Sequence, residues 1–307
     1  NHSDGHTLLN RLAKSNLFIV PLDDERRWYR YHHLFADLLR YRLQREQANI
    51  IPDLHHRASK WHEKHGFIDR AIHHAMAGDD FEMAADLIEA NGLTLIGQGA
   101  YITLQNWINS LPKNILQDRP YLCVYHSWAS NFSHQLEAVE PYLNNALRAL
   151  DAMNLPANDG VCKDILGHIA TLQAQDARRQ HNNSLAINLL IKAVDHLDKS
   201  NSFVRTLAEL NLGLAYLDEG ELVQSAESFR NAISIGRDSG NDLVTMVAIS
   251  QLVAVLILQG RLHDGEKLCK QTIQDQAIRH TKLPPSTCMI FLRLGYILAE
   301  WNDVAGY

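Results

Sequence analysis

Histidine is the side chain with the most chemical potential in this 307-residue sequence, which contains 17 of them. A helical zinc-hydrolase motif needs two histidines four residues apart with a glutamate between them, because that spacing puts both imidazoles on one face. The segment His62-Glu63-Lys64-His65 is one residue too short for this motif. His55 shares a helix face with His62, but they lie about 10 Å apart, too far to hold one ion. Surface or capping histidines are therefore favoured, and we predict no metal site.

The cysteines and the common catalytic motifs do not indicate an enzyme. Four cysteines stand 39, 107 and 19 residues apart, without a CxxC pair, as is typical of a reducing compartment. The phosphate loop GxxxxGK(S/T), the dinucleotide motif GxGxxG and the nucleophile elbow GxSxG are absent from the sequence. The most apolar stretch, residues 243–258, is too short and too polar to span a bilayer. We predict no catalytic residue, no cofactor in this chain, no membrane contact and a cytoplasmic location.

Composition favours helices as the elements that position these side chains. The sequence is 46% hydrophobic and only 7% aromatic, and residues 157–283 contain no proline, which suits helices and disfavours an all-β fold. Glycines expected near helix ends, where a left-handed residue is wanted, are Gly66, Gly78, Gly220, Gly236 and Gly260.

The charge is uneven along the chain. The net charge of −6 divides into +3 over residues 1–70 (12 Lys/Arg, 9 Asp/Glu) and −9 over the rest (17 and 26). An acidic body argues against a grip on nucleic-acid backbone. The basic residues that form either a weak candidate patch or an ordinary solvated face are Arg26, Arg27, Arg30, Arg40, Arg42 and Arg45.

One short segment near the start has the pattern of a β-hairpin. The apolar run 17–20 and the aromatic run 28–31 flank polar turn residues. An amphipathic segment at 7–15 precedes this hairpin, and leucines at helical spacing follow it from Leu34. Helix, hairpin and helix within about 45 residues resemble the last part of a winged-helix domain.

The rest of the chain shows a repeat of about 40 residues. Segment 212–222 aligns with segment 252–262, and in both an apolar helix ends at a glycine before the next helix opens. Gln180 and Asn302 take the glycine position in the neighbouring repeats. Small and aromatic residues at 213, 216, 225, 229 and 232 match the tetratricopeptide (TPR) signature. We predict an all-α, TPR-like solenoid of antiparallel helix pairs, with a small N-terminal winged-helix remnant that contains one hairpin.

One column of this repeat is polar where its neighbours are mostly apolar. On the first helix of each pair the position that faces the groove of a TPR stack holds Thr171, Asn211, Gln251 and Arg293. A polar ladder on a groove wall could orient a ligand, or it could simply be solvated. The predicted binding residues are these four together with Tyr296, with Arg293 and Tyr296 suited to an anionic or ring-bearing ligand.

Several segments resemble the MalT-like, large ATP-binding LuxR-family transcriptional regulators. The run from Leu17 to Leu39, which includes Trp28-Tyr29-Arg30-Tyr31-His32-His33, looks like the end of their winged helix. The similarity continues through Leu54–Trp61 and Ala71–Ala75 to Trp107-Ile108-Asn109-Ser110-Leu111-Pro112. It is specific over about 1–150 and generic in the repeats. The resemblance implies the end of a winged helix at 1–50, a helical arm at 51–118 and a truncated TPR-like sensor domain at 119–307.

The family's architecture implies what a longer protein would contain. An ATP-binding module would precede this chain, a LuxR-type DNA-binding domain would follow it, and inducer plus ATP would promote self-association. The absence of an initiator Met and the helical pattern that runs into the C-terminus fit a piece of such a protein. Tyr31-His32-His33-Leu34 also resembles the Met-His-Asp motif of NB-ARC switch proteins, so His32 is the expected nucleotide sensor of the intact protein, although His33 replaces the aspartate. The alternative is that His32 packs between hairpin and helix.

Two functions from different classes follow. The first is a sensor and oligomerisation region that binds a small inducer or a regulatory protein on the concave surface. The second is a TPR-like scaffold that binds protein partners and no small molecule. DNA contact would occur only through a domain outside this chain.

Overall fold

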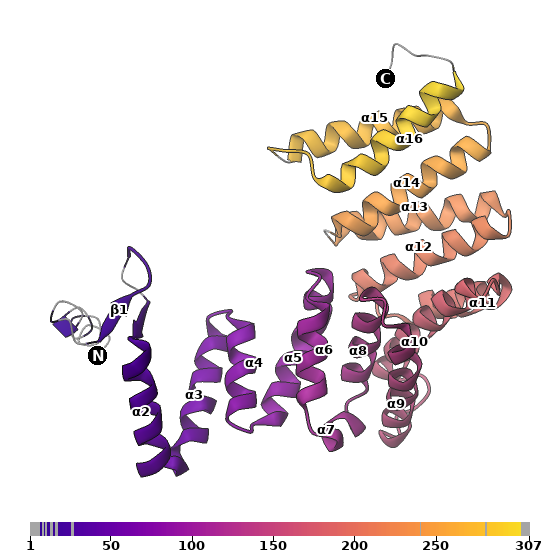
Figure 1. The fold of residues 1–307 in the computed structure, drawn as a ribbon. Helices are drawn as coiled ribbons and strands as arrows, with labels where there is room; N and C mark the ends of the chain where they lie inside the picture. The colour runs from indigo at the N-terminus through magenta and orange to yellow at the C-terminus, as the bar shows by residue number, and fades with distance from the viewer. Residues whose placement is uncertain are drawn as a thin grey trace. The chain divides into compact units, whose positions relative to one another are not determined.

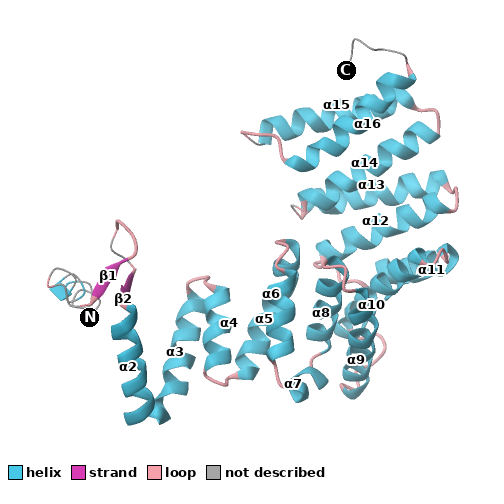
Figure 2. Cartoon of the chain, in the orientation of Figure 1, coloured by secondary structure: helices cyan, strands magenta, loops and turns pink. Residues whose placement is uncertain are grey.

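A computed structural model gives the structure of the chain and describes residues 7, 9, 11, 12, 15, 18–25, 28–239, 241–279 and 281–301. Leu17, Arg26, Arg27, Asn302 and residues 8, 10, 13 and 14 of the amphipathic segment expected at 7–15 lie outside the described residues. Contacts divide the chain into two compact units, 1–87 and 88–307, with the division inside one helix. The described elements are helices apart from one two-stranded hairpin near the N-terminus, which confirms the predicted fold class (Figures 1 and 2).

The first unit begins with the predicted hairpin. Strands β1 and β2 pair antiparallel, with Ile19 opposite Tyr31 and Pro21 opposite Tyr29. Trp28, just before β2, packs edge-on against Trp61 and Phe67 at ring distances of 5.9 and 5.4 Å, which attaches the hairpin to the helices that follow. From residue 18 onward, the elements described in this unit are β1 (Ile19–Pro21), β2 (Tyr29–Tyr31), α2 (His33–Glu46), a 3₁₀ turn (Ala48–Ile50), α3 (Ile51–Lys64), α4 (Ile68–Ala77) and the start of α5 (Phe81–Gly97).

The second unit is a succession of antiparallel helix pairs. The first helices of the pairs, α8, α10, α12, α14 and α16, each pack against the next and form a continuous row, while the second helices fill the spaces between them. The helices are α6 (Tyr101–Ser110), α7 (Lys113–Gln117), α8 (Pro120–Phe132), α9 (Val139–Ala152), α10 (Gly160–Arg179), α11 (Asn183–His196), α12 (Ser202–Asp218), α13 (Leu222–Asp238), α14 (Asp242–Leu258), α15 (Leu262–Arg279) and α16 (Cys288–Glu300).

The turn between the helices of a pair closes in the same way in successive repeats. At Gly220 the backbone N–H donates to the Leu217 carbonyl, the next N–H donates to the Tyr216 carbonyl, and φ is +80°. Gly260 makes the same closure with φ of +72°. In the preceding pair this position is His181, with φ of +59°, and not Gln180, whose φ is −87°. The predicted alignment of that repeat is therefore wrong by one residue, because the glycine that marks the position elsewhere is missing.

Two of the other glycines expected at helix ends have a different role or conformation. Gly236 lies inside α13, and a Cβ there would approach the Thr245 hydroxyl oxygen to 2.2 Å, so this glycine allows α13 and α14 to pack closely. Gly78 has a negative φ, and the left-handed residue of that turn is Asp79, with φ of +56°.

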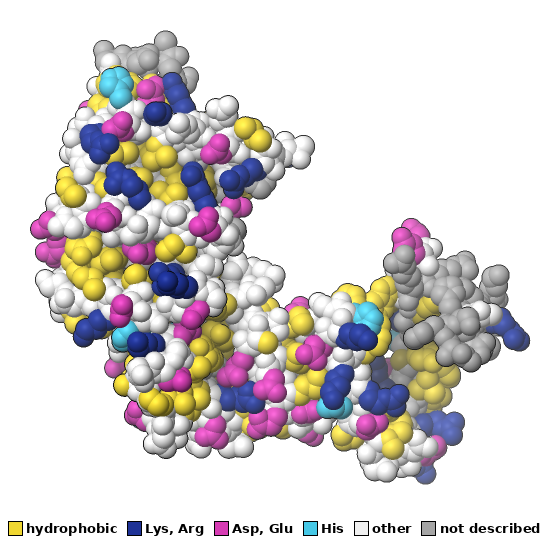
Figure 3. Space-filling model, turned by 180° about the vertical axis from the view of Figure 1, so that it is seen from behind, with side chains coloured by type: hydrophobic (Ala, Val, Ile, Leu, Met, Phe, Trp, Pro, Cys, Tyr) yellow, Lys and Arg dark blue, Asp and Glu magenta, His cyan; other side chains and the backbone are white. Residues whose placement is uncertain are grey.

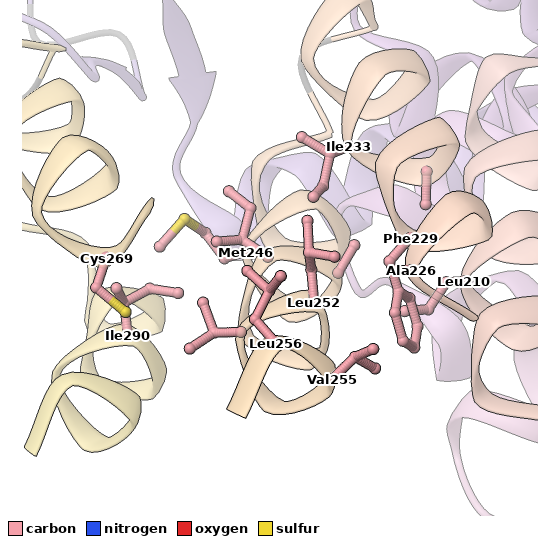
Figure 4. Close-up of a cluster of buried hydrophobic side chains, with 14 of the residues drawn as sticks. Leu210, Ala226, Phe229, Ile233, Met246, Leu252, Val255, Leu256, Cys269 and Ile290 are labelled. Carbon is pink, nitrogen blue, oxygen red and sulfur yellow. The ribbon is translucent and has the colours of Figure 1, made fainter. Parts of the chain in front are cut away.

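The later repeats share one large cluster of buried apolar side chains. Phe229 on α13 is fully buried, and its ring occupies the space that a side chain at Gly213 would need, since a Cβ there would lie 2.6 Å from the ring. Figure 4 shows the surrounding cluster, which runs from Leu210 on α12 through Leu252 and Leu256 on α14 to Ile290 on α16. We call this cluster the apolar core.

Candidate functional site

The structure divides the predicted polar ladder into buried and accessible members. Thr171 is fully buried, and its hydroxyl donates to the Gly167 carbonyl one turn back. Asn211 is 7% exposed and its amide donates to the Leu207 carbonyl. The Thr171 hydroxyl and the Asn211 amide nitrogen thus hydrogen-bond to their own helix, and both side chains are almost entirely buried. The prediction that the ladder lines an open groove therefore fails at Thr171 and Asn211.

The remaining three predicted residues lie on α14 and α16, which pack against each other. Nε of Arg293 donates to the Ser250 hydroxyl at 3.2 Å, which joins α16 to α14 beside Gln251. Gln251 is half-buried, and its side chain has no hydrogen-bond partner among the residues described. Tyr296, one turn after Arg293, is 53% exposed, and its hydrogen bond to the Glu300 carboxylate raises the pKa of the phenol.

The accessible side of α14 is narrow and mainly apolar. Along this helix the partly accessible residues recur at helical spacing as Val247, Gln251, Ala254 and Leu258, and the residues between them are mostly buried. Gln251 is the one polar side chain in this row. The members of the predicted ladder that a ligand could reach are therefore those on α14 and α16. That these residues bind an inducer stays a prediction.

A buried polar cluster that the sequence interpretation missed joins α8, α10 and the start of α12. The indole N–H of Trp128 donates to Nδ1 of His168 at 3.0 Å. On the other side of this imidazole, the Asn201 amide lies 2.6 Å and the Asp164 carboxylate 3.5 Å from Nε2. The Tyr121 hydroxyl donates to Asp164 at 3.0 Å. We call these five residues the polar junction.

Burial and hydrogen bonding set the charges in the polar junction. Although burial raises the pKa of Asp164, hydrogen bonds from His168, the Asp198 backbone and Tyr121 lower it to about 2. Burial and the adjacent carboxylate raise the pKa of Tyr121. Since an indole N–H can only donate, Nδ1 of His168 accepts the hydrogen bond from Trp128. The junction therefore holds an ionised aspartate whose carboxylate is satisfied, and this arrangement fits a structural connection between repeats.

Side-chain spacing in the sequence gives only a partial signal of this cluster. Trp128 and His168 are 40 residues apart, and so are Arg178 and Asp218, which pair across α10 and α12 at 3.0 Å. Arg178 and Asp218 stand at similar repeat positions, three and two residues before the left-handed His181 and Gly220, whereas Trp128 and His168 stand six and thirteen residues before His134 and His181. Asp164 and His168 add an i, i+4 pair on one helix face.

The first unit places the other predicted residues at its surface. His32 is the N-cap of α2, and its backbone N–H donates to the Phe18 carbonyl at the end of the hairpin. Its ring is exposed and lies 4.3 Å from that of His33, so the alternative of a packed His32 is not what the structure shows. Of the basic residues described here, Arg40 and Arg42 pair with acidic residues of their own helix at 3.1 and 3.2 Å, which fits a solvated face.

His74 on α4 contacts two histidines of α3, His55 and His62. Nδ1 of His55 lies 2.9 Å from Nδ1 of His74, and His62 stacks on His74 with ring centroids 5.3 Å apart. Burial and neighbouring positive charge lower the pKa of both His62 and His74. Within the described part of the chain, no group of three or more His, Cys, Asp or Glu residues could hold a metal ion.

Comparison with known proteins identifies the family. Residues 1–50 match a model of the MalT winged helix domain, and residues 167–305 match a model of the MalT-like TPR region. Together these matches cover more than half of the chain. The chain belongs to the MalT-like family.

Individual relatives extend the match along this MalT-like chain. It is 26% identical over 302 residues, 97% of its length, to the HTH-type transcriptional regulator MalT of Yersinia pestis and to that of Yersinia pseudotuberculosis. The protein of the same name from Yersinia enterocolitica is 28% identical over the same length. The chain spans about a third of the length of these relatives.

The comparisons confirm the resemblance at both ends of the MalT-like chain. The winged-helix match covers the predicted segment 1–50, and the TPR match begins within α10. The predicted limits of the arm and sensor, 51–118 and 119–307, stay predictions. No helix in the described part of the chain is both long and apolar enough to cross a membrane.

Proposed function

We propose that this chain is the sensor region of a MalT-like transcriptional regulator and that the inner faces of α14 and α16 bind its inducer. The observation that carries this proposal is the one polar group in the accessible row of α14. Gln251 has unused hydrogen-bonding capacity, and Arg293 and Tyr296 stand on the neighbouring helix. A few polar groups on a mainly apolar wall are what orients a small ligand.

The relatives support the regulatory part of the proposal, since they are named HTH-type transcriptional regulators. In the intact protein we expect an ATP-binding module before this chain, with His32 as a sensor of the bound nucleotide. DNA contact would come from a further domain, and inducer binding would promote self-association. This fragment then supplies the ligand-dependent step and carries out no catalysis.

A protein-binding scaffold is the second candidate, and one observation favours it. Leu258 and Leu292 are 62% and 73% exposed on the same two helices, and exposed apolar side chains beside Tyr296 suit a protein partner. The scaffold predicts affinity for a protein, whereas the sensor predicts affinity for a metabolite.

A thermal-shift screen of metabolites tests the proposal. A ligand that binds the folded chain raises Tm, because it stabilises the native state by mass action. We expect Gln251→Ala with Tyr296→Ala to abolish the ligand-dependent shift and to leave the Tm of the free protein nearly unchanged. The matched control is Gln173→Ala, which removes an exposed glutamine from α10. If a protein partner raises Tm and no metabolite does, the scaffold replaces the sensor.

A further inference from the structure

A second surface lies between α13 and α15, with α14 as its floor. It forms a groove of about 460 Å³ that is open to solvent. Its walls and floor include Arg230 and Arg237 of α13, Leu252 and Leu256 of α14, and Leu268 of α15. Figure 3 shows hydrophobic side chains between dark-blue Lys and Arg side chains on the C-terminal helices of the chain. We call this surface the basic groove.

The arginines of α13 are available for a partner. Arg230 and Arg237 are both exposed, and the described residues contain no ion-pair partner for either. They stand seven residues apart, so they share a face of α13 at a separation of about 10 Å. Arg261, which also lines the groove, is already paired with Asp264 at 2.6 Å. Asp238 at the end of α13 opposes only part of the remaining positive charge.

The floor of the basic groove is preformed. Ile233, Leu252 and Leu256 are 8%, 5% and 4% exposed and belong to the apolar core. Figure 4 shows Leu252 and Leu256 together on α14, with Ile233 from the neighbouring helix. An occupant would therefore meet a fixed apolar surface between two free guanidinium groups, without reorganisation of the core.

We propose that the basic groove docks an amphipathic helix of a partner protein that carries acidic residues. Two carboxylates seven residues apart on such a helix match the spacing of Arg230 and Arg237, and guanidinium groups bind carboxylates through paired hydrogen bonds. Apolar residues three and four positions after the first carboxylate fall between them on the same face and cover the floor. The open form of the groove favours a helix, since small-molecule sites enclose most of their ligand.

This docking site is separate from the proposed inducer site. It is built on the second helices of the pairs and on the buried side of α14, whereas Gln251, Arg293 and Tyr296 belong to the first helices. Loss of inducer binding and loss of helix docking can therefore be measured independently, with variants that share no residue.

Fluorescence anisotropy with a designed peptide tests the proposal. The probe is a labelled helical peptide with Glu at two positions seven apart and Leu three and four positions after the first Glu, and its matched partner carries Lys in place of both Glu residues. We expect the acidic peptide to bind the native chain and to bind Arg230→Glu/Arg237→Glu at least tenfold more weakly. The lysine peptide should bind this double variant more tightly than it binds the native chain, which shows that the variant is folded.

The control is Arg148→Glu, which changes an exposed arginine of α9 whose guanidinium group donates a hydrogen bond to Asn145 of its own helix. It should bind the acidic peptide as the native chain does. The milder double variant Arg230→Gln/Arg237→Gln removes the two positive charges without introducing negative ones. It should also weaken binding of the acidic peptide. The proposal is overturned if the acidic peptide does not bind, if the groove variants and Arg148→Glu bind it equally, or if millimolar citrate displaces it completely, since the groove would then be a site for small anions.

Discussion

In the polar junction, successive first helices of the stack are joined by buried hydrogen bonds, whereas in the apolar core they are joined by apolar packing. His168 stands thirteen residues before the left-handed position of its repeat, His181, and Leu207 and Val247 stand thirteen residues before Gly220 and Gly260. One repeat position thus holds a hydrogen-bonded imidazole near the start of the stack and aliphatic side chains further along. The backbone tolerates either, provided that the first helices still meet.

This difference has consequences for specificity and response. A hydrogen-bonded cluster requires particular partners at particular positions, whereas an apolar core requires mainly shape and volume. The apolar core includes residues of α14 and α16, which carry the proposed inducer surface, and it also forms the floor of the basic groove. The polar junction lies away from them, which suits a fixed connection.

The largest expected effect is in the apolar core. Phe229→Ala should lower the free energy of unfolding by about 3–5 kcal/mol, because a fully buried ring is removed and Gly213 cannot fill the space. Urea denaturation with a circular dichroism readout measures this. Leu258→Ala is the control, since that side chain is 62% exposed and should change stability by less than about 1 kcal/mol. Similar losses for both variants would contradict a localised core.

Low pH should lower the free energy of unfolding through His126, a buried histidine near the start of the helix stack. Burial lowers the pKa of His126 on α8 to about 4, and its Nε2 is buried without a hydrogen-bond partner among the described residues. The unfolded chain therefore binds more protons below pH 6.5, so this stabilising contribution is complete above pH 6.5 and is lost as the pH falls toward 4. The loss is on the order of 3 kcal/mol.

His126→Phe should make the free energy of unfolding less dependent on pH between 6.5 and 4, and it should keep the stacking on Tyr142. Some dependence remains, because the lowered pKa values of His62 and His74 act in the same direction. Equilibrium denaturation at a series of pH values measures the slope. An unchanged slope would show that His126 is protonated as easily in the folded chain as in the unfolded one.

Stability should fall when His168 in the polar junction is replaced by leucine, the residue at the equivalent position of the next repeat. His168→Leu introduces the side chain found at position 207, yet it should lower the free energy of unfolding by about 2 kcal/mol, because the buried Trp128 N–H loses its acceptor. His33→Leu, at an exposed histidine, is the control in the same denaturation assay. A stabilised His168→Leu would mean that the junction is an apolar site in which the hydrogen bonds contribute nothing.

The smallest effect tests the alignment of the repeats. His181→Gly should raise the free energy of unfolding by about 0.5–1 kcal/mol, because a residue with a Cβ is strained at φ of +59°. Gln180→Gly, one residue earlier at φ of −87°, should instead lower it by a similar amount. Thermal denaturation distinguishes the two variants, and the opposite order would restore Gln180 to the position predicted from the sequence.

Periodicity and turn residues were enough to predict the fold. The glycines at 220 and 260 mark the repeat, and the two β-favouring runs near the start mark the hairpin. His181 was missed because its left-handed conformation has no signal in residue type. The family could be predicted because residues 17–39 carry a specific pattern.

The candidate site was predicted only in part. Thr171 and Asn211 look like groove residues when positions are counted, but a short polar side chain on a buried helix can return its hydrogen bond to its own backbone. The polar junction was missed because its members are dispersed over 80 residues and meet only in the folded stack. The i, i+4 spacing of Asp164 and His168 was the one signal of this cluster in the sequence.

Hydrogen–deuterium exchange of the chain with and without the metabolite that raises Tm most in the screen tests the central claim most directly. The account predicts slower exchange in α14 and α16 and unchanged exchange in α8 and α10. It also predicts that this protection is lost in Gln251→Ala/Tyr296→Ala. Protection confined to the polar junction or to α13 and α15, or a screen in which no metabolite raises Tm, would contradict a sensor surface on α14 and α16.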